Sequence, residues 1–187
     1  MRIVAGKFRS RRLQGPRGDA LRPTSDRLRE TLFDILQPVV EDSFFVDVFA
    51  GTGAVGLEAL SRGARRVVFI ENHRAALGLI RANLAALGVD SGAEVLALDA
   101  ARGIELLASR GEPADLIFLD PPYALGQEYE RIVKLLGRTL LVAPHTPVIL
   151  ERSRKLALPE RFGRLGRVRV VEQGDAALDF YGLQSKE

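Results

Sequence analysis

The stretch Phe45-Val46-Asp47-Val48-Phe49-Ala50-Gly51-Thr52-Gly53-Ala54-Val55-Gly56 decides the fold of this 187-residue chain. Its apolar start predicts a buried strand, and the spacing G-x-G-x-x-G predicts a tight loop that leads into a helix. Glycines at these positions let a ligand approach the backbone and let the helix pack closely on the sheet. Glu71 follows the next expected strand, 20 residues after Gly51. A carboxylate there would bind the ribose hydroxyls of a nucleotide-like cofactor.

Strands and helices alternate on the C-terminal side of this loop. Strands are expected at 44–49, 66–70, 94–98, 115–119 and 147–151, and helices at 55–61, 73–87, 101–109 and 128–136. This alternation predicts a doubly wound, Rossmann-like α/β fold, in which helices cover both faces of a mostly parallel sheet. The tail differs, because 168–171 and 178–183 flank a Gln-Gly-Asp turn and predict an antiparallel hairpin, which makes seven strands in all.

Three acidic positions favour S-adenosylmethionine over a nicotinamide dinucleotide as the cofactor. Asp47 lies inside the first strand, where it would repel a pyrophosphate but would pair with the ammonium of a methionine group. Asp99 ends the third strand and is placed to accept a hydrogen bond from an adenine amino group. Asp120 follows the fourth strand, which adjoins the first at the topological switch point of a doubly wound sheet. The alternative for Asp47, Glu71 and Asp99 is a simple role as strand-end caps.

The turn Asp120-Pro121-Pro122-Tyr123 comes directly after the apolar run 116–119 and suits the binding of a planar amino group. Asp120 can accept one N–H, a proline carbonyl can accept the other, and Tyr123 offers a flat face to the ring. Enzymes that methylate the exocyclic amines of nucleobases need such an arrangement. The alternative is an ordinary acidic turn at the end of a strand, since Asp and Pro are common turn residues.

Composition excludes several other chemistries. The chain has no cysteine, which rules out disulfides, thiolate metal sites and the cysteine adduct through which pyrimidine carbons are commonly methylated. The two histidines, His73 and His145, are far apart in the sequence and indicate no metal site. No apolar stretch reaches the roughly 20 residues that span a bilayer, and the first residues lack the apolar region of a signal peptide. A soluble cytoplasmic protein is therefore expected.

Basic residues gather towards the two ends of the chain. Residues 1–30 carry nine Lys and Arg against three Asp and Glu, whereas residues 31–150 carry ten against fifteen. This distribution suits an enzyme that holds a polyanion at its rim, with a second basic run at 152–169 adding phosphate contacts. A solvated charged surface is the alternative. Residues 2–13 predict a basic β-hairpin, and a helix is expected from an N-cap at Thr24 or Ser25 to a stop at Pro38.

With these motifs the chain resembles the bacterial 16S ribosomal RNA guanine-N2 methyltransferases of the RsmD type. The resemblance covers nearly the whole chain, and its most particular stretches are RPTSDRLRETLF at 22–33 and GLEALSRGA at 56–64. The start IVAGK at 3–7 also matches. The glycine loop and the Asp120–Tyr123 turn match as well, but many amine methyltransferases share them.

The resemblance implies an S-adenosylmethionine-dependent methyltransferase domain of class I at 23–187, which methylates one guanine amino group of 16S rRNA, of the guanine-966 type. The N-terminal hairpin and connector at 1–22 would bind this RNA, within a small-subunit particle. No metal is indicated, and nothing in the sequence demands more than a monomer. The implied catalytic residues are Asp120, Pro121, Pro122 and Tyr123. The implied cofactor-binding residues are Asp47, Phe49, Ala50, Gly51, Gly53, Glu71, Asn72, Asp99 and Ala100. The RNA-binding side chains expected are Arg2, Lys7, Arg9, Arg11, Arg12 and Arg22.

Other functions stay open from the sequence alone. The nearest is methylation of adenine N6 or cytosine N4 in DNA, which the turn does not distinguish, although no target-recognition domain is evident. Methylation of a protein glutamine is less favoured, because that reaction usually goes with Asn at the position of Asp120. A non-catalytic RNA-binding assembly factor is a third possibility, and the intact turn and glycine loop argue against it.

Overall fold

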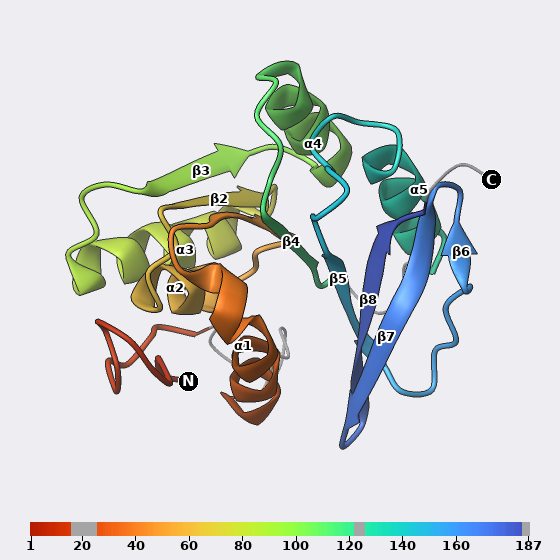
Figure 1. Ribbon diagram of the computed structural model, residues 1–187. Coiled ribbons are helices and arrows are strands. Elements are labelled where there is room, and N and C mark those ends of the chain that lie inside the picture. The colour runs from red at the N-terminus through yellow and green to blue at the C-terminus, as the bar shows by residue number, and fades with distance from the viewer. Residues whose placement is uncertain (16–25, 122–125, 185–187) are drawn as a thin grey trace.

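The computed structural model describes residues 1–15, 26–121 and 126–184. Within these residues, eight strands form a single sheet in the order β3-β2-β1-β4-β5-β8-β7-β6 (Figure 1). The strands are β1 (Phe44–Val48), β2 (Arg66–Glu71), β3 (Ala93–Ala97), β4 (Leu116–Leu119), β5 (Val148–Ser153), β6 (Arg161–Phe162), β7 (Leu165–Gln173) and β8 (Ala176–Leu183). The helices are α1 (Asp26–Val40), α2 (Ala54–Ser61), α3 (Arg74–Leu87), α4 (Ala100–Ser109) and α5 (Gly126–Leu136).

The sheet is doubly wound, as predicted. Strands β1 to β5 are parallel, and β8, β7 and β6 continue the sheet in antiparallel pairing. The chain winds outward from β1 to β3 on one side, and β4 and β5 follow on the other side of β1. The direction of winding therefore reverses between β1 and β4, which is where ligands bind in folds of this kind.

Helices cover both faces of the sheet, so the central strands are buried throughout. One apolar cluster joins α1, α2 and α3 to the first face, where the rings of Phe33 and Phe45 stack with centroids 6.2 Å apart. A second cluster joins α4 and α5 to the opposite face. Every residue of β1 and β4 is buried, as expected for parallel strands between two helical layers. Among the described helices, none is both long and apolar enough to cross a membrane.

Two boundaries differ from the sequence prediction. The sheet has eight strands rather than seven, because Arg161–Phe162 pairs with the start of β7 as a strand of two residues. A strand this short has no alternation from which it could be recognised. Helix α1 also continues past Pro38 to Val40, whose side chain is buried in the core. Its predicted N-caps, Thr24 and Ser25, lie outside the described residues.

The predicted N-terminal β-hairpin is only partly formed. Its two arms run antiparallel, but a single bridge between Arg2 and Arg12 replaces the expected pair of strands. The arms still exchange backbone hydrogen bonds, such as the bond of 3.0 Å from Ile3 N to the Arg11 carbonyl, but helix α2 accepts bonds from other N–H groups of the segment. Lys7 N donates to the Ser61 carbonyl at 2.7 Å, and Phe8 N donates to Ser61 Oγ at 2.9 Å.

Candidate active site

The loop between β1 and α2 bends sharply at the switch point. Phe49, Gly51 and Gly53 have φ values of 62°, 55° and 78°, and Gly53 N donates a hydrogen bond of 2.7 Å to the Ala50 carbonyl. A Cβ on Gly53 would lie 3.2 Å from Ile80, so a side chain there would be both strained and crowded. Phe49 adopts a left-handed conformation without being glycine, and such strain is concentrated at functional sites. The loop therefore presents tightly turned backbone, as predicted for a ligand-binding loop.

Asp47 lies beneath this loop, buried to 2 % exposure. Its Oδ2 accepts a hydrogen bond of 2.9 Å from Gly56 N, in the first turn of α2. Burial raises the pKa of Asp47 to about 8, because the bond from Gly56 only partly offsets the loss of water, and Glu71 and Glu151 add repulsion. The carboxyl therefore holds a proton at neutral pH unless a cation lies beside it.

Glu71 joins the end of β2 to the glycine loop. Its Oε2 accepts a hydrogen bond of 2.9 Å from Gly51 N, and its Oε1 accepts bonds from Asn72 N at 2.8 Å and His73 N at 2.7 Å. The spacing of 20 residues seen in the sequence thus corresponds to a direct contact in the fold. Glu71 is partly exposed and Asn72 is exposed beside it. Their contacts with a ribose stay a prediction.

Asp99 caps helix α4. Its side chain accepts a hydrogen bond of 3.0 Å from Arg102 N, and it is 40 % exposed. Ala100, the first residue of the helix, is buried. Asp99 is thus the N-cap of a helix, whereas the alternative considered from the sequence was a strand-end cap. Its contact with an adenine amino group stays a prediction, as does the role of Ala100.

Asp120 begins its turn beside the glycine loop. Its N–H donates to the Val48 carbonyl of β1 at 3.4 Å, so the turn starts where β1 ends. Burial raises the pKa of the Asp120 carboxyl well above its usual value, and repulsion from Glu151 and Asp47 raises it further. The residue is partly exposed, and within the described chain no donor bonds its carboxylate. This carboxylate is thus available to a ligand.

The rest of the turn is described only in part. Pro121 is buried next to Asp120. Pro122 and Tyr123, which are predicted catalytic residues, lie outside the described residues, as does Arg22. The stacking role of Tyr123 therefore stays a prediction.

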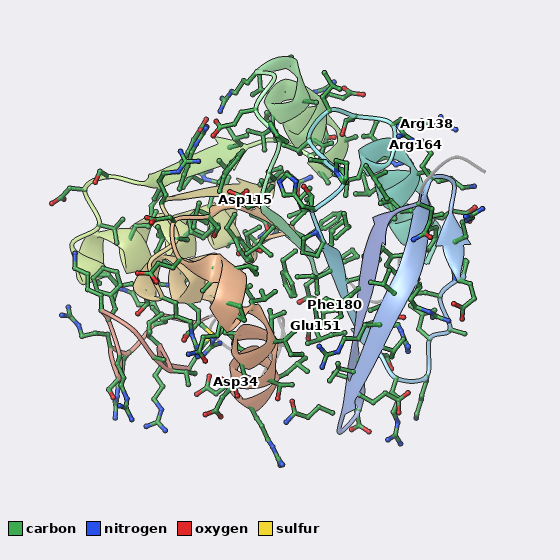
Figure 2. The ribbon with its side chains drawn as sticks, in the orientation of Figure 1. Asp34, Asp115, Arg138, Glu151, Arg164 and Phe180 are labelled. Atoms are coloured by element: carbon green, nitrogen blue, oxygen red, sulfur yellow. The ribbon has the colours of Figure 1, made fainter. Side chains whose placement is uncertain are left out.

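Glu151 is a residue of this site that the sequence did not indicate. It lies in β5, is 4 % exposed, and contributes to the raised pKa of both Asp47 and Asp120. Figure 2 shows Glu151 near Phe180, at the end of the sheet away from Asp115, which precedes β4. A signal was available, since the predicted strands 115–119 and 147–151 both lead to an acid at their carboxyl ends. No three His, Cys, Asp or Glu side chains of the described chain are grouped so as to hold a metal ion.

The N-terminal segment, residues 1–15, is packed along α2 and α3. Ile3 and Leu13 are buried in the core, and Val4 N and Ala5 N donate to the buried Glu58 carboxylate at 2.8 and 3.0 Å. The predicted RNA-binding side chains of this segment are all exposed: Arg2, Lys7, Arg9, Arg11 and Arg12. Of these side chains, Arg11 donates a hydrogen bond of 2.6 Å from Nη2 to the Ala86 carbonyl of α3. The segment thus presents a basic surface on a fixed backbone.

The second basic run contributes less to the surface than its sequence suggests. Arg152 is buried and pairs with Asp179, which also pairs with Arg167 at 3.0 Å. Arg167 pairs with Glu160 as well. These two arginines offset a buried carboxylate of the tail hairpin, so their predicted role as phosphate contacts is not supported.

The doubly wound sheet, the glycine loop at its switch point and the acidic Asp120 beside that loop define the class of the protein. They are the features of an S-adenosylmethionine-dependent methyltransferase, a fold shared by solved structures of such enzymes. S-adenosylmethionine is accordingly the cofactor.

Comparison with known proteins then gives the family. The family model described as Conserved hypothetical protein 95 matches residues 1–182, and the chain belongs to this family, with the RsmD-type rRNA methyltransferases. Ribosomal RNA small subunit methyltransferase D of Escherichia coli K12 is 40% identical over 159 residues, covering 85% of this chain and 78% of its own length. The protein of the same name from Haemophilus influenzae is 36% identical over 169 residues, with coverages of 87% and 84%. The solved structure of the Escherichia coli protein yhhF has a TM-score of 0.83 and 36% identity, covering 100% of this chain and 99% of its own.

Proposed function

We propose that this protein transfers a methyl group from S-adenosylmethionine to the exocyclic N2 of one guanine in 16S rRNA, of the guanine-966 type. The observation that carries the proposal is the open carboxylate of Asp120 beside the glycine loop, in a chain whose relatives are named small subunit rRNA methyltransferases. The enzyme acts as a monomer in the cytoplasm, on rRNA within a small-subunit particle.

The cofactor-binding residues fit the chemistry of this cofactor. S-adenosylmethionine, when bound, supplies an electrophilic methyl on a sulfonium. Asp47, with its pKa of about 8, is suited to pair with an ammonium, because a cation restores the ionised form that burial disfavours. Glu71 and Asn72 would hold the ribose, and Asp99 and Ala100 the adenine. The bent backbone of Phe49, Ala50, Gly51 and Gly53 would lie against the methionine part.

Asp120 and the Pro121 carbonyl prepare the amine. The N2 lone pair of guanine is delocalised into the ring, so the free amine is a weak nucleophile. Accepting its two N–H groups favours a pyramidal nitrogen and aims the lone pair at the methyl, so that catalysis comes largely from positioning. The attacked nitrogen then loses one proton to Asp120 or to water. The raised pKa of Asp120 makes its carboxylate a better proton acceptor than an ordinary aspartate.

The substrate base must leave its stack to reach Asp120, at a cost of a few kcal/mol. Stacking on Tyr123 would return about 1–3 kcal/mol of this. The exposed basic side chains of the N-terminal segment would contact phosphates, so we expect rRNA binding to weaken steeply as salt rises.

The test is transfer of labelled methyl from S-adenosylmethionine to 16S rRNA, small-subunit particles and duplex DNA, with the product nucleoside identified by mass. We expect N2-methylguanosine from the RNA substrates. Asp120→Ala should reduce the rate by about 10³-fold or more, since the amine loses its main acceptor. Glu105→Ala, which changes an exposed acid on α4, is the matched control and should leave the rate unchanged.

Other outcomes would replace the proposal. Label in DNA would assign the chain to the adenine or cytosine methyltransferases. A full rate for Asp120→Ala would remove the turn from the mechanism. Failure to bind S-adenosylmethionine would leave an RNA-binding assembly factor.

A further inference from the structure

The turn at Asp120 and Pro121 binds an amino group but does not select the base that carries it. Guanine, adenine and cytosine each have an exocyclic amine on their Watson–Crick edge. They differ in the ring nitrogen beside it, which is a donor in guanine (N1–H) and an acceptor in adenine (N1) and cytosine (N3). An enzyme that reads a flipped base by this edge therefore needs a second group next to the amine acceptor.

Glu151 lies on the strand next to Asp120. Leu119 of β4 pairs with Leu150 of β5 in parallel register, so Asp120 and Glu151 come next on neighbouring strands, which lie about 4.8 Å apart. Side chains alternate along a strand, and the preceding residues that face the α1 side are Phe118 and Ile149. Asp120 and Glu151 therefore point to the same face, at the same end of the sheet.

The charges around Asp120 favour a ligand rich in donors. Asp47 lies on the next strand, one pair earlier in register and on the same face, since it pairs with Phe118. Among the described residues, no ion pair involves Asp47 or Asp120, and both have a raised pKa to which Glu151 contributes. Adjacent N–H groups would offset this repulsion, whereas a lone pair would add to it.

We propose that Glu151 is a specificity-determining residue, which accepts a hydrogen bond from guanine N1–H while Asp120 accepts one from the N2 amine. This inference rests on the proposed function and states how the site recognises guanine. Adenine or cytosine would place a ring lone pair against the Glu151 carboxylate. Selection then comes from repulsion of the wrong base as well as attraction of the right one.

The test compares two target bases that share the 2-amine. Small-subunit particles are assembled on 16S rRNA that carries either guanosine or 2-aminopurine riboside at the methylated position, and initial rates of methyl transfer are measured. 2-Aminopurine has an acceptor at N1 in place of the N–H. A site built to accept the N–H should reject it, and we expect wild type to prefer guanosine by about 10²-fold or more.

The variant Glu151→Gln then tests whether Glu151 causes the preference for guanosine over 2-aminopurine riboside. The carboxamide can donate to N1 of 2-aminopurine, so the preference for guanosine should fall by at least about tenfold. Glu105→Gln, on exposed surface, should keep the wild-type preference. Because 2-aminopurine also lacks the O6 of guanine, the informative quantity is the change in preference between variants, which cancels the effect of O6.

Each outcome decides the matter. Equal wild-type rates on the two bases, or an unchanged preference in a folded Glu151→Gln, would overturn the role of Glu151 and leave the proposed function intact. Absence of N2-methylguanosine from wild type would overturn the proposed function, and this inference with it. Thermal melting and S-adenosylmethionine binding report folding. If Glu151→Gln does not fold, Glu151→Asp withdraws the carboxylate and should slow methylation of guanosine more than that of 2-aminopurine, and equal slowing would overturn the role.

Discussion

Two groups of buried charged side chains lie on the face of the sheet covered by α1, α2 and α3, and their surroundings are opposite in kind. In the first, the fully buried Glu58 carboxylate is surrounded by donors. Arg62 Nε lies 2.9 Å from it and Arg29 Nε 3.5 Å, and the backbone N–H groups of Val4 and Ala5 complete the shell. Here the cost of burying charge is offset by partners.

In the second group, carboxylates face one another. Asp47, Asp120 and Glu151 come from three adjacent strands, and their mutual repulsion adds to the effect of burial in raising the pKa of Asp47 and Asp120. Within the described residues, no ion pair offsets the charge of Asp47 or Asp120. The difference indicates that the Glu58 group holds the structure together, whereas the second group serves ligands that bring their own positive charge or N–H donors.

The largest effect that would test this contrast is the loss of the Glu58 charge. Glu58→Gln leaves Arg29 buried without its counter-charge and replaces an acceptor oxygen by a donor, so we expect the free energy of unfolding to fall by about 3–5 kcal/mol. Urea denaturation measures this change. Glu30→Gln, an exposed acid on α1, is the control and should change stability by less than about 0.5 kcal/mol. Similar stabilities for the two variants would mean that the Glu58 group is not structural.

A smaller effect, with the opposite sign, is expected at Asp47. Between about pH 4 and 8, the folded protein keeps a proton on Asp47 that the unfolded chain has released, so the free energy of unfolding falls as pH rises through this range. The side chain introduced by Asp47→Asn does not titrate, so this fall in the free energy of unfolding is absent from the variant. Without cofactor, the variant should gain stability over wild type by on the order of 2–4 kcal/mol between pH 5 and pH 8.

Urea denaturation at the two pH values checks this expectation, with Asp34→Asn on the exposed side of α1 as the control. A difference between Asp47→Asn and wild type that is the same at pH 5 and pH 8 would show that Asp47 is ionised in the folded protein. Burial would then not keep Asp47 protonated, and the second group would not differ from the Glu58 group in this respect.

The elements that position the site were predictable because their signals are local. The strand before Gly51, the glycine spacing and the acids in or next to the first, second and fourth strands are contained in short stretches of sequence. They correctly placed Asp47, Glu71 and Asp120 around one switch point.

What escaped prediction depends on contacts between distant parts of the chain. The N-terminal arms form a single bridge in place of two strands, and Glu58 and Ser61 of α2 accept hydrogen bonds from several N–H groups of the segment. The sequence around Arg29 does not indicate that this side chain is fully buried, yet it lies beside Glu58. The position of Glu151 next to Asp120 becomes evident only when β5 is known to pair with β4. In each case the partner, and not the residue itself, decides the role.

The smallest effect concerns the segment that the Glu58 group holds in place. If this group exists to fix the N-terminal segment, the exposed charges of the segment should act on RNA and not on stability. Lys7 and Arg9 are exposed, and their joint replacement, Lys7→Ala with Arg9→Ala, removes two expected phosphate contacts. We expect the Kd for 16S rRNA to rise about tenfold, and the slope of log K against log salt to fall by about 1.5. The melting temperature should stay as in wild type.

Arg138→Ala provides the control, since Arg138 is exposed after α5, on the side of the molecule away from the N-terminal segment (Figure 2). Its replacement should leave the salt slope unchanged. An unchanged slope in the Lys7 and Arg9 variant as well would mean that the segment serves only packing. The Glu58 group would then stabilise the fold without contributing to recognition of the substrate, and the basic surface that binds rRNA would have to be sought on another part of the molecule.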